Sequence, residues 1–175
     1  ILVTGAGGPM GCNVTRSLRL AAEGYRLIGT DANPLHLPLR LTDEIHRVPL
    51  ARDLDAYLGA LDTLIERYEV DLVFPTHPVE VRTISAHRDR LKAATFLPTH
   101  DAILRGQDKY ASYEAWTEAG VPVPLTFLMD SPEALDEAFD TLEDRPVWVR
   151  GSGVPGAGIG VASLPCRNRA GARAW

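Results

Sequence analysis

The residues of this sequence with the clearest chemical potential form a glycine-rich segment near its end. Residues 151–160 carry glycine at every second or third position, directly after an apolar run that ends in Arg150. The backbone N–H groups of such a loop can surround a chain of phosphates, and the guanidinium of Arg150 can bind phosphate oxygens through two parallel hydrogen bonds. A plain hairpin turn is the alternative, but it seldom needs so many glycines. The segment therefore predicts nucleotide binding, though not of the Walker type, because no Gly-Lys-Ser/Thr is present.

A second glycine-rich turn, Thr4–Gly11, joins a predicted strand to a predicted helix near the start of the chain. Asp31 follows Gly11 by 20 residues, the spacing at which a dinucleotide-binding fold places an acid on the ribose. Such turns also serve only to pack a helix against a strand. Gly7, Gly8 and Asp31 are therefore candidate ligand-binding residues with a purely structural alternative.

Taken alone, this turn resembles that of an extended short-chain dehydrogenase or epimerase. Such an enzyme needs a tyrosine and a lysine four residues apart, so that the lysine lowers the pKa of the tyrosine. The only lysines are Lys92 and Lys109, and neither follows a tyrosine at that spacing. An NAD-dependent enzyme therefore remains an alternative hypothesis, although the tyrosine–lysine pair that it needs is missing. A non-catalytic module that binds a ligand or a partner is a second alternative.

Short β-rich runs alternate with longer amphipathic runs over the first hundred residues, which predicts a parallel α/β sheet. The predicted strands are Ile1–Thr4, Arg26–Thr30, Ile45–Val48, Asp71–Phe74 and Thr95–Leu97. The first predicted helix has an apolar stripe at helical spacing, formed by Met10, Val14, Leu18 and Ala22. The next begins after Asp53 and turns inward Leu54, Tyr57, Leu58, Leu61, Leu64 and Ile65. We therefore expect a Rossmann-like domain over residues 1–100.

The pattern changes after residue 100, where a second domain, residues 101–175, is predicted. A helix over Asp108–Ala119, a strand over Thr126–Met129 and a helix capped by Ser131 come first. The strands Val147–Arg150 and Ile159–Leu164 then flank the glycine-rich segment. A strand, glycine loop and returning strand do not belong to a doubly wound sheet, so this part is expected to be an α+β lobe.

Polar residues also follow the predicted strand Asp71–Phe74. Thr76, His77 and Glu80 lie just past its end, where open α/β sheets bind ligands. Thr76 and Glu80 are candidate substrate-binding residues. His77 is a further possible substrate contact, and a capping or solvent-facing role is the favoured alternative for both His77 and Glu80.

Several of these motifs occur together in one family. Gln107-Asp108-Lys109, Glu118–Pro124 and Val147–Arg150 with its glycine loop resemble the start of an ATP-grasp domain. Their order is similar to that of carbamoyl-phosphate-synthase large-subunit-like members. Ile1–Gly11, Asp31, Phe74–Thr76 and Glu80 resemble the pre-ATP-grasp domain that precedes it there. The resemblance covers essentially the whole chain.

The resemblance implies an ATP-dependent ligase that uses Mg-ATP to activate a carboxylate as an acyl phosphate for attack by an amine. The residues that match the family's ATP-binding positions are Lys109, Arg150, Gly153, Gly156, Ala157 and Gly158. Gly151 departs from the family, which usually has proline there. The family's magnesium ligands lie downstream of the glycine loop and are expected after Trp175, so no metal site is expected within this chain. The chain alone is therefore expected to be incomplete for catalysis.

Composition limits the partners. Hydrophobic residues make up 45% and charged residues 23%, with a net charge of −5. This balance argues against nucleic-acid or membrane-surface binding, and no apolar run approaches the roughly 20 residues of a membrane span. Two cysteines and no signal-like start predict a cytoplasmic protein. Because the chain opens on Ile1 and stops at Trp175, we expect it to be a fragment. Its expected partners are small-molecule carboxylate and amine substrates. A homo-oligomer, or a partner subunit that carries the missing lobe, is a further option.

Overall fold

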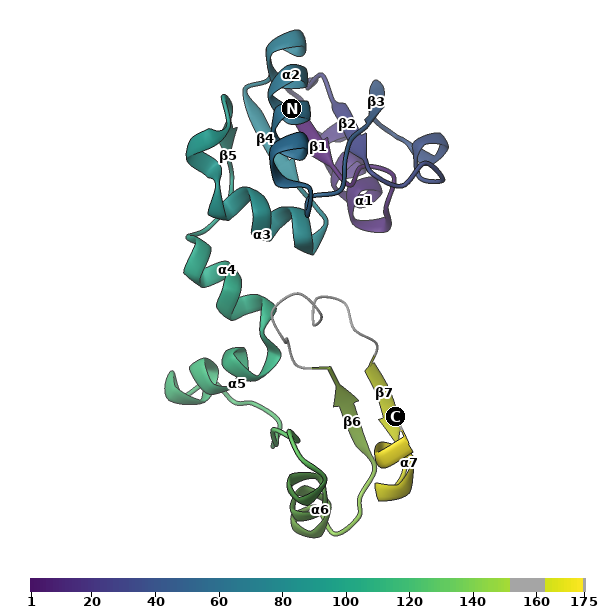
Figure 1. The fold of residues 1–175 in the computed structure, drawn as a ribbon, viewed down its shortest axis with the longest axis vertical. Coiled ribbons are helices and arrows are strands. Elements are labelled where there is room, and N and C mark those ends of the chain that lie inside the picture. Colours follow the sequence, from purple (N-terminus) through teal and green to yellow (C-terminus); the bar gives the residue numbers. More distant parts are fainter. Residues whose placement is uncertain (152–162, 175) are drawn as a thin grey trace. The chain divides into compact units, whose positions relative to one another are not determined.

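The computed structural model describes residues 1–151 and 163–174, which form two compact units (Figure 1). The N-terminal unit is Ile1–Ile103 and the C-terminal unit is Leu104–Trp175. The predicted boundary at residue 100 falls close to this division, and the assignment of the two parts as domains stays a prediction. The predicted ATP-binding residues Gly153, Gly156, Ala157 and Gly158 lie outside the described residues.

The N-terminal unit is built on a five-stranded sheet in the order β3-β2-β1-β4-β5, with every neighbouring pair parallel. Its strands are β1 (Leu2–Thr4), β2 (Ile28–Asp31), β3 (Glu44–Arg47), β4 (Leu72–Pro75) and β5 (Ala94–Thr95). All five predicted strands are present, with their ends moved by one or two residues. The predicted Rossmann-like parallel α/β sheet is therefore confirmed, and the order of strands makes β1 the central one.

The helices of this unit are α1 (Pro9–Arg19), α2 (Leu54–Tyr68) and α3 (Pro78–Ala86), with short 3-10 helices η1 (Leu37–Leu39) and η2 (Arg88–Arg90). The predicted inner face of α2 is confirmed. The buried residues of α2 pack with Leu2, Ile28 and Val73 of the sheet. These buried residues are Tyr57, Leu58, Leu61, Leu64 and Ile65. Each large apolar side chain buried in this core contributes about 1.5–3 kcal/mol to folding.

The helix predicted from the apolar stripe is confirmed as α1, but only part of that stripe turns inward. Met10 is 61% exposed, and the helix ends before Ala22. The buried residues of α1 are instead Gly11 and Thr15, one turn apart. A Cβ on Gly11 would lie 2.2 Å from the carbonyl oxygen of Gly5, so only glycine lets the helix approach the preceding turn this closely. Close backbone contact at Gly11 thus sets the most buried part of this face, on which Val14 and Leu18 are half-buried.

The C-terminal unit contains α5 (Lys109–Glu118), α6 (Pro132–Thr141), an antiparallel hairpin and α7 (Arg169–Ala174). The hairpin strands are β6 (Val147–Arg150) and β7 (Ser163–Cys166), and α4 (His100–Gln107) precedes α5. A small core joins α6, the hairpin and α7, and it is made of Phe139, Val149, Cys166 and Ala172. The helices of this unit predicted at residues 108–119 and after Ser131 are confirmed, as is the strand Val147–Arg150.

Two predicted strands of this unit differ from the structure. The strand at Thr126–Met129 is wrong, because residues 121–130 have no regular secondary structure. Pro122 and Pro124 just before it have no N–H to donate to a strand ladder. The returning strand, predicted at Ile159–Leu164, is described over Ser163–Cys166 and so extends two residues further, while residues 159–162 lie outside the described part. Across residues 1–151 and 163–174, no helix is both long and apolar enough to cross a membrane.

Candidate functional site

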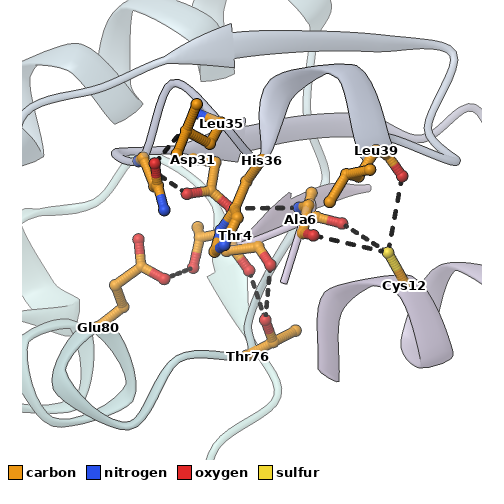
Figure 2. Close-up of polar contacts among 12 residues, drawn as sticks. Thr4, Ala6, Cys12, Asp31, Leu35, His36, Leu39, Thr76 and Glu80 are labelled. Atoms are coloured by element: carbon orange, nitrogen blue, oxygen red, sulfur yellow. Dashed lines mark hydrogen bonds and ion pairs between the residues drawn. The ribbon is translucent and has the colours of Figure 1, made fainter. Parts of the chain in front are cut away.

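The candidate residues of the N-terminal unit meet at the edge of the sheet where β1, β2 and β4 end (Figure 2). Thr4 ends β1, Asp31 ends β2 and Thr76 directly follows β4. Glu80 lies in the first turn of α3. Because parallel strands present their carboxyl ends at one edge, the fold gathers side chains that are more than 70 positions apart in sequence.

Glu80 is one of two buried acids at this edge, and only 7% of its surface is exposed. Its Oε2 accepts a hydrogen bond from the Thr4 hydroxyl at 2.9 Å, and its Oε1 accepts one from the Tyr57 hydroxyl at 3.0 Å. Burial raises the pKa of Glu80 to about 7, although both hydrogen bonds act in the opposite direction. A buried acid that titrates near neutral pH is typical of functional sites.

Asp31 is also buried, but the chain itself uses its oxygens. Oδ1 accepts a hydrogen bond from the backbone N–H of Asn33 at 2.9 Å, and Oδ2 accepts one from the N–H of Gly7 at 3.2 Å. The ring Nδ1 of His36 lies 3.1 Å from the same Oδ2. Asp31 therefore ties the loop after β2 to the glycine-rich turn, which favours a positioning role over ribose binding.

The glycines of the turn Thr4–Gly11 explain why the loop after β2, which carries His36, can lie so close to that turn. A Cβ on Gly7 would stand 2.2 Å from the carbonyl oxygen of His36. Gly5 has φ +62°, and a Cβ there would meet Thr76 Oγ1 at 2.9 Å. Gly8 is the N-cap of α1, without a side-chain cap, and its N–H donates to the carbonyl of Gly5 at 3.1 Å. The close approach at Gly7 is thus made by the chain's own loop.

Thr76 and His77 complete this edge of the sheet. The hydroxyl of Thr76 donates to the carbonyl of Thr4 at 2.7 Å, which joins the ends of β4 and β1. His77 is the exposed N-cap of α3, and its Nδ1 accepts a hydrogen bond from the N–H of Val79 at 3.3 Å. The capping role favoured for His77 is confirmed.

The described cations of the predicted ATP site are both exposed, and they belong to the C-terminal unit. Lys109 is the first residue of α5, because the carboxylate of Asp108 caps that helix by accepting the N–H groups of Tyr110 and Ala111 at 2.9 and 3.0 Å. Arg150 is the last residue of β6 and stands immediately before the glycine-rich segment. No hydrogen bond links the two side chains within the described residues.

Sequence analysis missed two residues of the site in the N-terminal unit. Thr4 was predicted as the end of a strand and the start of the glycine-rich turn, and Tyr57 as part of an apolar helix face. One signal was available for Tyr57, because a buried tyrosine hydroxyl usually has a hydrogen-bond partner. The identity of that partner, Glu80, depends on how α2 and α3 pack on the sheet.

The described residues, 1–151 and 163–174, hold no group of three or more histidine, cysteine, aspartate or glutamate side chains that could bind a metal ion. The acids of the sheet edge, Asp31 and Glu80, instead have partners from the chain itself.

Comparison with known proteins gives no match to a family model and none to a curated protein. Solved structures do match. An ADP complex of N5-carboxyaminoimidazole ribonucleotide synthetase is 19% identical, with 99% of this chain and 42% of that chain covered and a TM-score of 0.68. The same enzyme from Thermus thermophilus is 20% identical, with 99% and 42% covered and a TM-score of 0.66.

A third similar structure is the biotin carboxylase domain of Hydrogenobacter thermophilus 2-oxoglutarate carboxylase, solved with MgADP, ADP and bicarbonate. It is 20% identical, with 97% of this chain and 38% of that chain covered and a TM-score of 0.59. These enzymes are ATP-grasp family members, so the fold of this chain is that of the N-terminal part of ATP-grasp enzymes. The fold predicted from the family resemblance is confirmed. The chain spans about two fifths of the length of these relatives.

Proposed function

We propose that the chain is the N-terminal part of an ATP-grasp ligase and that its C-terminal unit binds ATP. The observation that carries this proposal is the position of Arg150. It is exposed at the end of β6, directly before the glycine-rich segment, in a fold whose relatives were solved with ADP. Lys109 is a second exposed cation at the start of α5.

In the proposed reaction, a carboxylate oxygen attacks the γ-phosphorus of ATP, ADP leaves, and an amine then displaces phosphate from the acyl phosphate. Phosphoryl transfer needs cations and N–H donors around the phosphate oxygens, where negative charge is spread in the transition state. Arg150 and Lys109 would supply the cations. Gly153, Gly156, Ala157 and Gly158 would supply backbone N–H groups.

Magnesium is implied by the fold family and by the MgADP of one relative. The described residues of this chain offer it no cluster of carboxylates, so we assign it to none of them. The proposed contribution of this chain to ATP binding is limited to its cations and its backbone N–H groups.

The edge of the sheet in the N-terminal unit is the proposed substrate site. Glu80, Thr76 and the glycine turn with Gly7 and Gly8 follow the carboxyl ends of β4 and β1, where open α/β sheets bind ligands. Asp31 contributes by fixing the loop that borders the turn. The NAD-dependent alternative gains no support, because the acid expected on the ribose already accepts hydrogen bonds from the chain at both oxygens.

The test is a matched pair of arginine variants in the protein that contains these residues. Arg150→Ala removes the proposed phosphate contact, whereas Arg145→Ala removes an exposed arginine of the same unit that pairs with Glu143. Charge-assisted hydrogen bonds contribute about 1.5–3 kcal/mol, so calorimetry should show that Arg150→Ala weakens ADP binding by about 10- to 100-fold. Arg145→Ala should leave ADP affinity unchanged. Equal ADP affinity in the wild type and both variants would remove Arg150 from the site, and no ADP binding at all would favour a non-catalytic module.

A further inference from the structure

A pocket of about 390 Å³ lies at the amino edge of the sheet, the opposite edge from Glu80. Among its lining residues, Ile1 precedes β1, Arg26 precedes β2, and Asp71 precedes β4. Its volume falls in the range of about 300–1,000 Å³ that is usual for small-molecule sites. The proposed function gives this pocket no role.

One wall of the pocket is a part of the sheet that α1 does not cover completely. Val73 of β4 packs with α2, whereas Leu72 and Phe74 point to the opposite face, because successive residues of a strand alternate. The connections β1–α1–β2 and β3–α2–β4 cross the sheet in opposite directions, so right-handed crossovers place α1 on that opposite face. Leu72 and Phe74 are nevertheless only half-buried, and Leu18 of α1 borders the pocket with them.

Aromatic side chains are concentrated at this pocket. The N-terminal unit has five aromatic residues, and four of them line the pocket: Tyr25, Tyr68, Phe74 and Phe96. The fifth, Tyr57, is buried in the core. Phe96 is 79% exposed, so its ring is available to a ligand. Because aromatic rings pair edge to face or offset-stacked, walls of this kind favour a planar aromatic ligand.

The charged groups of the pocket favour a ligand cation. The guanidinium of Arg26 is paired with Glu44 at 3.3 Å. The terminal amine of Ile1 donates a hydrogen bond to the carbonyl of Arg26 at 2.8 Å; burial lowers the pKa of this amine, whereas the charge of Asp71 acts in the opposite direction. Glu69 is then the lining carboxylate that has no ion-pair partner in the described part of the chain. A positive charge on a ligand would be attracted to it.

We infer that this pocket binds a small aromatic amine, whose ring packs against the aromatic side chains and whose ammonium group meets the carboxylate of Glu69. The inference goes beyond the proposed function and does not depend on it. A second copy of the chain is the competing occupant, because it would cover the same apolar surface.

Three small probes at pH 7 separate the contribution of the ring from that of the charge. Phenethylammonium carries both features, butylammonium lacks the ring, and phenylpropionate carries the opposite charge. Binding is followed by the backbone amide NMR signals of Leu72 and Val73 in the protein that contains these residues. We expect saturable shifts with phenethylammonium at a Kd of about 1 mM, and binding about 3- to 10-fold weaker for each of the other two probes.

Two matched pairs of variants test the residues that line the pocket. Phe96→Ala removes an aromatic wall, and Leu35→Ala is its control, since Leu35 is 78% exposed and does not line the pocket. Glu69→Gln removes the proposed charge contact, and Glu66→Gln is its control, since Glu66 pairs with Lys92 instead. Phe96→Ala should weaken phenethylammonium binding about 3- to 10-fold and Glu69→Gln about 2- to 5-fold, whereas both controls should bind as the wild type does.

The inference is overturned if phenethylammonium causes no saturable shift, if phenylpropionate binds as tightly, or if Phe96→Ala and Leu35→Ala bind the amine equally. Sedimentation velocity tests the competing occupant: self-association of the wild type that Phe96→Ala abolishes would assign the pocket to a second copy and overturn the inference as well. ADP affinity should be equal in the wild type and Phe96→Ala. Loss of amine binding therefore leaves the proposed function intact, and absence of ADP binding leaves this inference intact.

Discussion

The buried carboxyl of Glu80 makes the stability of the N-terminal unit depend on pH in an unusual direction. The pKa of Glu80 is about 7 in the folded protein, against 4.5 for an ordinary glutamate. Between these values the folded state binds the proton more tightly than the unfolded state, so the free energy of unfolding falls as the pH rises. At about 1.4 kcal/mol per pH unit, this costs the folded state about 3 kcal/mol above pH 7.

Glu80→Gln removes this cost, because the amide has the same shape and carries no charge. We expect the variant to gain about 1–3 kcal/mol at pH 8 and to lose most of the dependence of stability on pH between 5 and 7. An acid retained at such a cost is typical of a residue kept for function, so the variant should be more stable while it loses binding of the substrate at this edge.

The assay is urea unfolding followed by the backbone amide NMR signals of Leu2, Val3 and Thr4 in β1. These signals report on the N-terminal unit, whereas all three tryptophans lie in the C-terminal unit. Asp55→Asn is the control, since Asp55 is an exposed acid on α2 and should leave the pH dependence unchanged. If Glu80→Gln is less stable than the wild type at every pH and keeps the pH dependence, Glu80 stabilises the fold as an anion and the burial argument is refuted.

Two further substitutions test the packing that positions the sites. Gly7→Ala should destabilise the N-terminal unit by about 1–3 kcal/mol, because its Cβ would overlap the carbonyl of His36. Gly8→Ala should cost much less, since its nearest contact would be 3.4 Å, and equal urea midpoints for the two variants would contradict the close approach. Phe139→Ala should cost the C-terminal unit about 3–5 kcal/mol, because this ring is fully buried. Tryptophan fluorescence during urea unfolding measures this loss, and a cost under about 1 kcal/mol would argue against the small core around Phe139.

Much of the fold could be predicted because it depends on local pattern. The alternation of strands and helices specifies the parallel sheet, and the leucines of α2 select its inner face by their spacing. The helix caps could also be predicted, because Asp108 and Ser131 have short side chains that accept hydrogen bonds from N–H groups of the first helical turn. Local chemistry decides these features, so the sequence is sufficient for them.

The errors arise where distant segments decide the outcome. The inner face of α1 depends on how closely Gly11 approaches the turn at Gly5. The role of Asp31 depends on the loop that carries His36, and no spacing rule reports that this loop folds back onto Gly7. The pairing of Tyr57 with Glu80 joins two helices and becomes visible only once both lie on the same side of the sheet.

The central claim, that this chain belongs to a nucleotide-binding ligase rather than a dehydrogenase, is tested most directly by calorimetric titration of the protein with MgADP and with NAD. We expect saturable binding of MgADP, at least about tenfold tighter than binding of NAD, which is a difference of about 1.4 kcal/mol in binding free energy. Asp31→Ala should leave ADP affinity unchanged. Tight binding of NAD that is lost in Asp31→Ala, together with no binding of MgADP, would contradict the proposal of a ligase and favour a dehydrogenase.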